Sequence, residues 1–144
     1  MAGTQNYSNH TRWYPLFHFV VMPLLLLNFL SHLVRLFMAP SWGLGFWTLL
    51  GISLILLALA SRLQSLKAQD RLIRLEERLR YKELLSAELC QKASDLPVNQ
   101  IIALRFASDE ELGDLVTQVI DGKLTTQKEI KMAVKNWRAD YLRV

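Results

Sequence analysis

The chain has 144 residues, a formal net charge of +4 and a single cysteine, Cys90. Its length suits one domain, but all 13 acidic residues and 15 of the 17 lysines and arginines follow residue 61. This uneven division argues against one globular core, and a lone cysteine excludes an internal disulfide framework.

The first 61 residues contain two apolar stretches. The first, YPLFHFVVMPLLLLNFLSHLVRLF, occupies residues 14–37, and the second, WGLGFWTLLGISLILLALAS, occupies residues 42–61. A helix of about 20 residues crosses a hydrocarbon core of roughly 30 Å, so both stretches predict transmembrane helices. Pro40 and its small neighbours predict a tight turn and therefore an antiparallel hairpin over residues 14–61. The alternative, that the first stretch is a cleaved signal peptide, conflicts with its length.

Basic residues set the expected orientation of this hairpin. The turn between the two stretches contains no Lys or Arg, whereas Arg62, Lys67, Arg71 and Arg74 follow the second stretch. The positive-inside rule places that side in the cytoplasm, and with it the N-terminal tail, residues 1–13, whose only formally charged side chain is Arg12. These basic side chains could also lie against anionic lipid headgroups.

The first stretch carries a polar stripe. At 100° per residue, His18, Asn28, His32 and Arg35 fall within a sector of about 100° on one side of a regular helix. The stripe has two interpretations: contacts to another helix with Arg35 reaching the headgroups, or a site for a ligand, an ion or a proton.

Histidines in a membrane helix raise the question of haem or metal. His18 and His32 are 14 residues apart, about 21 Å along a helix, so one copy cannot clamp a haem between them. Haem would need histidines from several copies, and no C-x-x-C-H motif is present. His10 and His18 are poorly spaced for a metal site. We therefore predict no cofactor and no metal.

In the second stretch, Gly51 and Ala58 lie seven residues apart on one helix face. Small residues allow close approach of another helix, so this face is the expected contact for the first helix. The alternative is that glycine and alanine are simply frequent in membrane helices.

Residues 62–94 read as a charged helical stem that continues to about Ala93. Leu72, Leu75 and Leu79 begin a heptad seam, but Lys82 and Ser86 interrupt it. Three alternatives remain open: a short oligomeric coil, packing against the C-terminal part of the same chain, or a solvated stem.

Residues 95–144 predict a module of about three short helices. The segment VNQIIALRF follows a break at Pro97, and a second helix begins at Ser108, with Glu111 as its capping-box partner. Capping also explains Asp109, Glu110 and Glu111 better than a metal cluster does. TTQKEIKMAVKNW predicts a third helix with Ile130, Val134 and Trp137 on one face. No nucleic-acid motif and no catalytic constellation accompany these helices.

Both ends of the chain resemble one family of small bacterial two-span membrane proteins, a domain of unknown function. The resemblance rests on QNYSNHTRWYPLFHF at residues 5–19 and on ALRFASDEELGDLVTQVIDGKLTTQKEIKMAVKNWRADYLRV at residues 103–144. Its recurrent elements correspond to Asn9, His10, Arg12, Pro15, His18, Phe19, Arg105, Ser108, Asp109, Glu110, Lys131, Asn136, Trp137, Arg138, Asp140 and Tyr141. Thr126 and Ala139 stand where the family often has proline. The resemblance implies a bacterial inner-membrane location and supplies no activity.

The expected fold is thus an all-α membrane protein: a two-helix transmembrane hairpin, a long cytoplasmic helix and a small C-terminal helical bundle, with both termini cytoplasmic. The expected function is a non-enzymatic membrane-anchored interaction or accessory subunit, in a homo-oligomer or a larger membrane complex. The alternative is an oligomer that handles a ligand, ion or proton through His18, Asn28, His32 and Arg35. No nucleic-acid partner is expected.

Overall fold

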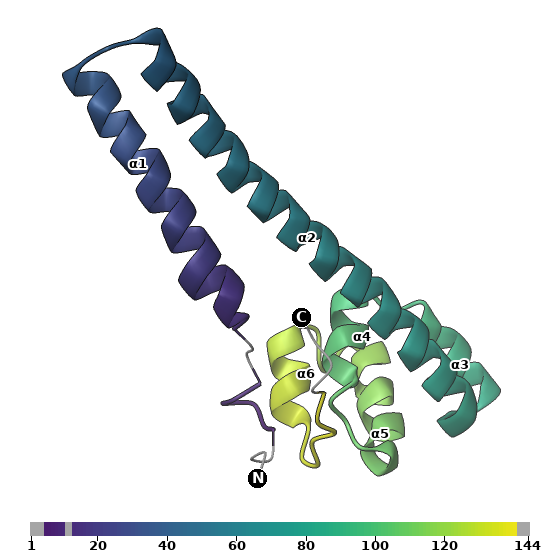
Figure 1. Ribbon diagram of the computed structural model, residues 1–144. Helices are drawn as coiled ribbons and strands as arrows, with labels where there is room; N and C mark the ends of the chain where they lie inside the picture. The colour runs from purple at the N-terminus through teal and green to yellow at the C-terminus, as the bar shows by residue number, and fades with distance from the viewer. Residues whose placement is uncertain (1–4, 11–12, 141–144) are drawn as a thin grey trace. The chain divides into compact units, whose positions relative to one another are not determined.

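The computed structural model describes residues 5–10 and 13–140 (Figure 1). Within these residues the protein is all-helical, with one isolated antiparallel bridge between Ala107 and Trp137. The elements are a π-helix η1 (Leu16–Val21), α1 (Met22–Met38), α2 (Trp42–Leu84), α3 (Ala87–Ser94), α4 (Val98–Leu104), α5 (Asp109–Ile120) and α6 (Gln127–Ala133). The chain forms two compact units: residues 13–66, and residues 67–140 together with residues 5–10.

The unit of residues 13–66 is the helical hairpin. α1 and the first part of α2 lie side by side and run in opposite directions, joined by a short turn (Figure 1). Among the described residues, two helices, Leu16–Met38 and Trp42–Leu84, each contain an 18-residue segment long and apolar enough to cross a membrane, with mean hydropathies of 1.9 and 2.1 over those segments. No residue of η1 or α1 is buried. The hairpin therefore exposes most of its apolar side chains.

The first helix begins with a π-helical segment, where a regular α-helix was expected. Pro23 has no N–H to donate, and its ring would clash with the carbonyl four residues earlier in an α-helix. Directly before it, the Met22 N–H bonds to the carbonyl oxygen of Phe17, five residues back. The wider turns provide an alternative to the bond that proline removes. The regular 100° spacing used to align His18 with the polar stripe therefore does not apply between Leu16 and Val21.

α2 is one continuous helix of 43 residues. No glycine or proline occurs between Gly51 and Pro97, so nothing local interrupts it. The expected stem helix to Ala93 is nevertheless wrong, because α2 ends at Leu84. Ser86 has an extended backbone and caps α3, its hydroxyl accepting from the Leu89 N–H. The break lets Leu85 and Leu89 pack against the core of the second unit.

That second unit has its own hydrophobic core. The last turns of α2 and helices α3 to α6 surround it (Figure 1). Its largest fully buried side chains are Tyr81, Phe106, Ile101, Leu104, Leu112, Ile130 and Val116. α5 follows its sequence pattern: Ser108 and Glu111 form the capping box, and Gly122 ends the helix with a φ of 74°.

α6 is shorter than its sequence pattern indicated. Thr126 caps it, with Glu129 as the capping-box partner, but the helix ends at Ala133 and Val134 is extended. Trp137 consequently lies beyond the helix and pairs with Ala107 instead. Residues 134–138 form a non-helical segment that bends at Lys135 and Asn136, which we call the C-terminal ribbon.

Candidate functional site

The four polar residues of the first apolar stretch do not converge on a common site. His18 Nδ1 lies 2.9 Å from the carbonyl oxygen of Tyr14 in its own segment. Asn28 and Arg35 are exposed, and no hydrogen bond joins Asn28 to His32 within the described residues. His32 is half-buried against α2. One hairpin therefore presents separate polar groups along η1 and α1.

His32 lies at the interface between the two hairpin helices. Its ring stacks on that of Trp47, with centroids 6.0 Å apart and planes 17° from parallel. Its Nδ1 atom is buried and has no hydrogen-bond partner among the described residues. Aromatic stacking holds the ring in place while one polar nitrogen stays unsatisfied.

The small-residue face of α2 meets α1 at Gly51. Gly51 is buried, and a Cβ atom there would lie 3.2 Å from the Cα atom of Phe29 and 3.3 Å from its Cβ atom. Ala58 is half-buried on the same helix. Close approach of α1 at this point therefore depends on the missing side chain of Gly51.

The basic residues that follow the second apolar stretch differ in their surroundings. Arg62 is half-buried, with its guanidinium carbon 6.0 Å from the ring centroid of Phe17. Lys67 and Arg71 are exposed, whereas Arg74 is half-buried and its Nε atom has no partner among the residues described. Lys67 and Arg71 are thus accessible to solvent.

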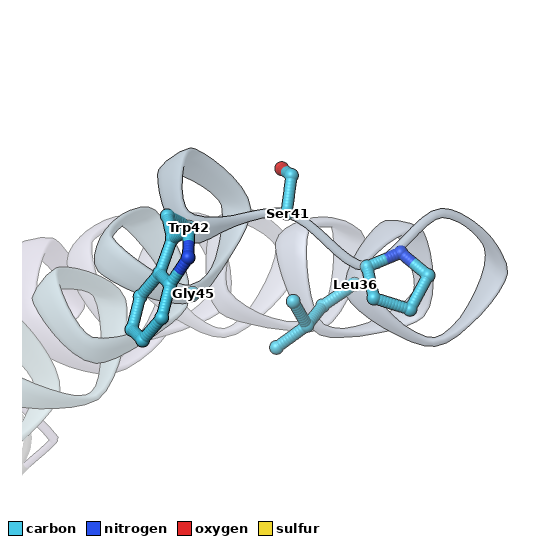
Figure 2. A pocket seen from close by; sticks show the side chains of 5 residues that line it. Leu36, Ser41, Trp42 and Gly45 are labelled. Atoms are coloured by element: carbon cyan, nitrogen blue, oxygen red, sulfur yellow. The ribbon is translucent and has the colours of Figure 1, made fainter.

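An open hollow of about 380 Å³ lies at the hairpin turn and is lined by Leu36, Pro40, Ser41, Trp42 and Gly45. Figure 2 shows the Leu36 and Trp42 side chains on one side of the turn and the Ser41 side chain pointing to the other. Trp42 is 98% exposed. Such an apolar, open turn suits contact with a surface better than enclosure of a ligand.

A second and more elaborate site lies where the two ends of the chain meet in the unit that holds the core. Asn6 orders the N-terminal segment, residues 5–10, by accepting from Ser8 N and donating its own N–H to Asn9 Oδ1 at 2.6 Å. Gln5 Oε1 accepts from the Asp140 N–H at 2.8 Å. These bonds fix the N-terminal segment beside the end of the described chain.

His10 anchors this segment through both ring nitrogens. Nδ1 lies 2.6 Å from the carbonyl oxygen of Tyr7, and Nε2 lies 3.3 Å from Nζ of Lys131 in α6. With the proton on Nδ1, Nε2 can accept from the lysine ammonium. The ring also contacts Phe106 and Trp137, at centroid distances of 6.0 and 5.8 Å.

Glu111 holds the C-terminal ribbon. One carboxylate oxygen accepts from the N–H groups of Ser108 and Asn136, at 3.2 and 3.1 Å, and the other accepts from Lys135 N at 3.1 Å. The capping residue of α5 thus also binds the backbone that follows α6. Three N–H donors to one carboxylate make a strong local clamp.

Buried charges in α2 connect the stem helix to this site. Arg80, only 9% exposed, donates to Glu77 at 3.2 Å, to Asp109 at 2.6 and 2.9 Å, and to the Ala107 carbonyl at 2.8 Å. Arg138 of the ribbon donates to the other Glu77 oxygen at 3.1 Å. Burial raises the pKa of the Glu77 carboxyl, and the guanidinium groups of Arg80 and Arg138 only partly oppose this.

A parallel ion pair ties Arg105 to the end of the described chain. Arg105 Nε lies 3.0 Å from a carboxylate oxygen of Asp140, and the guanidinium sits 4.4 Å from the Phe106 ring centroid. Phe106 is fully buried, and its carbonyl oxygen accepts from the Arg138 N–H. The segment after α4 and the C-terminal ribbon are therefore joined by charge, stacking and backbone pairing.

A surface hollow of about 430 Å³ lies in the midst of these contacts. It is lined by Gln5, Asn6, Ser108, Lys135, Asn136, Trp137 and Arg138. The lining combines amides, a hydroxyl, an indole and two cationic side chains, and includes no carboxylate. Such a surface can donate hydrogen bonds to an acidic or carbonyl-rich partner.

The residues at both ends that carry the family resemblance are brought together here. Those in this unit are Asn9, His10, Arg105, Ser108, Asp109, Glu110, Lys131, Asn136, Trp137, Arg138 and Asp140, whereas Pro15, His18 and Phe19 belong to the hairpin. Arg12 and Tyr141 lie outside the described residues. Glu77 and Arg80 were missed as site residues, because their spacing in a charged helix resembles an ordinary surface ion pair.

Within the part of the chain that the structure describes, no group of three or more His, Cys, Asp or Glu side chains is arranged to hold a metal ion. Asp109 and Glu111, two of the three acids considered for such a group, are instead engaged with Arg80 and with backbone N–H groups. Nearby, hydrogen bonding to Ser108 lowers the pKa of Glu110.

The chain belongs to the family described as "Family of unknown function (DUF6526)", which matches residues 1–144. This match confirms the resemblance to an uncharacterised family over the whole chain. No curated protein and no solved structure matches the chain.

Proposed function

We propose that this protein is a non-enzymatic membrane-anchored interaction subunit of the bacterial inner membrane. In this proposal the hairpin of residues 14–61 spans the bilayer, both termini are cytoplasmic, and the helical module binds another protein through the hollow between the N-terminal segment and the C-terminal ribbon.

Support for the anchor comes from the exposed apolar surface of the hairpin. Large side chains remain exposed along both helices, among them Leu27 at 67%, Phe37 at 80% and Leu57 at 65%. Water would strongly disfavour so continuous an apolar surface, whereas a bilayer would solvate it. The basic residues that follow α2's apolar half favour a cytoplasmic location for the module.

Support for the interaction role comes from what the charged groups beside the hollow do. Arg80, Glu77 and Glu111 hold backbone segments and one another, rather than aligning a nucleophile with a base over the hollow. The result is a fixed surface with cationic Lys135 and Arg138 at its edge. This arrangement is the single observation that carries the proposal, and it favours an acidic peptide segment as the partner.

The proposal is tested by placing a photo-crosslinking residue at Asn136, which lines the hollow, in the full chain, with Lys128 in α6 as the exposed control position. We expect one defined partner protein to cross-link from position 136 and not from position 128, and the added charge reversal Lys135→Glu to abolish the adduct. The proposal would be contradicted if the intact, membrane-bound protein is isolated under mild conditions without a partner protein and gives equal cross-links from both positions.

The second candidate, an oligomer that handles a ligand, ion or proton, has one observation in its favour. The Nδ1 atom of His32 is buried without a partner among the described residues, and such groups within membrane helices often take part in function. The substitutions His18→Leu, His32→Leu and Arg35→Leu distinguish the candidates. If this triple variant fully complements a deletion strain, the handling role is excluded. If the variant fails to complement the strain although it still binds the partner protein, the first proposal is excluded.

A further inference from the structure

The part of α2 that belongs to the second unit, Lys67–Leu84, has two different faces. One face is buried in its own chain and carries Ile73, Glu77, Arg80 and Tyr81. The opposite face carries Leu72, Leu75 and Leu79, which are 56, 56 and 53% exposed. Three leucines with spacings of three and four residues form a narrow apolar seam in a segment rich in charge.

The two faces follow one heptad. With Leu72 and Leu79 at a and Leu75 at d, the residues buried against the module fall at b, c and f, the outer positions of a coiled coil. Packing of the module thus leaves the seam uncovered, and a second α2 helix could approach it without displacing any contact of Glu77 or Arg80.

The charges beside the seam indicate which partner fits it. Positions g and e carry Arg71, Glu76, Arg78 and Glu83. In a parallel pair of identical helices, each g residue faces the e residue five positions later in the other copy, so Arg71 meets Glu76 and Arg78 meets Glu83. An antiparallel pair would place g against g and e against e, which brings like charges together.

We propose that α2 pairs in parallel with α2 of a second copy of this chain through Leu72, Leu75 and Leu79. Two copies anchored with the same orientation present α2 in the same direction, as the charge pattern requires. The seam is too short to pair freely diffusing helices, so its pairing depends on anchoring, which raises the local concentration. This inference concerns a surface that the proposed partner site does not use.

Arg78 requires separate attention because it is half-buried and already donates to the Ser94 carbonyl through Nη2 at 2.8 Å. Its other terminal nitrogen is the group that would reach Glu83 of the second copy. Arg71, Glu76 and Glu83 are exposed, so the Arg71 and Glu76 pair is the cleaner one to test.

The test uses the full chain in lipid nanodiscs, with two differently tagged copies co-expressed. Arg71→Glu and Glu76→Arg each create two repulsive contacts in a homodimer, whereas a mixture of the two variants restores both attractive contacts. We expect the association constant of the two copies to fall about tenfold for each variant alone, and to recover when the two variants are mixed. A structural effect on the monomer would not be rescued by mixing.

A second readout is disulfide formation between copies in a Cys90→Ser background. Leu75→Cys is expected to cross-link under mild oxidation, whereas Lys128→Cys, exposed on α6, is the control and is expected not to. The proposal is overturned by equal cross-linking of the two cysteines, by particles with any number of copies other than two, or by failure of the mixed charge variants to recover pairing.

Discussion

Removal of Arg80 is the most direct perturbation of the helical module, because this side chain joins α2 to the segment before α5. Its guanidinium contacts Glu77, Asp109 and the Ala107 carbonyl, and it is only 9% exposed. Arg80→Met keeps the apolar stem and removes the charge. Among the described residues, Glu77 would then remain buried with Arg138 as its one remaining cationic partner.

The expected decrease in the free energy of unfolding follows from the burial of each partner of Arg80. Breaking a buried pair from one side costs about 3 to 5 kcal/mol, and the orphaned Ala107 carbonyl adds about 1. The Asp109 side chain is 62% exposed, so its loss of a partner contributes less than about 1 kcal/mol. Because Arg138 still partly compensates Glu77, we expect a total of about 4 kcal/mol, roughly a thousandfold in the local opening constant.

Amide hydrogen exchange of the full chain in nanodiscs measures this directly. Peptides that cover α4, α5 and the C-terminal ribbon should lose protection in Arg80→Met, while peptides from the hairpin should not change. Lys67→Met, at an exposed position on the same helix, is the control. A loss below about 1 kcal/mol for Arg80→Met would refute the claim that this network holds the module together.

Four further perturbations test other parts of the structure. Because the pKa of Glu77 is raised above its ordinary 4.5, the native state holds the proton on Glu77 to higher pH than the unfolded state does. The contribution of Glu77 to the free energy of unfolding therefore falls as pH rises from 4.5 through the raised pKa. In denaturant titrations of the full chain at several pH values, Glu77→Gln should reduce the dependence of the free energy of unfolding on pH, and an unchanged dependence would contradict this. Tyr81 is fully buried, and its hydroxyl has no partner among the described residues. Tyr81→Phe should therefore raise the free energy of unfolding by about 1 kcal/mol. A decrease of that size would indicate that the hydroxyl is hydrogen-bonded. Gly51→Leu would force the side chain into Phe29 and should cost about 1 to 3 kcal/mol in detergent unfolding of the hairpin, whereas an unshifted midpoint would mean that the helices do not pack there. Glu111→Gln should lower the free energy of unfolding by about 2 kcal/mol and speed amide exchange in the C-terminal ribbon. Protection equal to that of the wild type would show that Glu111 does not hold the ribbon in place.

Much of the helical architecture could be predicted from local sequence signals. The capping box at Ser108 and Glu111 lies where its residue types indicated, because this signal acts over only a few residues. The apolar stretches likewise mark the two long helices, since length and composition suffice for that prediction.

The two helix ends that were predicted wrongly, those of α2 and α6, depend instead on tertiary contacts. The end of α2 at Leu84 depends on Ser86 as a cap and on the burial of Leu85 and Leu89, which no helix propensity reveals. α6 ends early, and beyond it Glu111, 24 residues from Lys135, binds the ribbon backbone. Local periodicity carries no information about a partner so distant in the sequence.

The candidate site was predicted less well than the fold. The polar stripe of the first apolar stretch drew attention to His18 and Arg35, yet a polar network joins the N-terminal segment to α6 and to Asp140. Glu77 and Arg80, three residues apart, read as a surface pair on a charged helix. Only the packing of the module on that face makes them buried.

The central claim, that the hairpin crosses a membrane and leaves its turn and its module on opposite sides, is tested by labelling single cysteines in sealed vesicles. In a Cys90→Ser background, Ser41→Cys reports the turn and Glu88→Cys, at an exposed position on α3, reports the module. An impermeant maleimide added from one side should label only one of the two variants, and vesicles of the opposite orientation should reverse the result. Labelling of both cysteines from the same side, or release of the intact chain by an alkaline wash, would contradict the account.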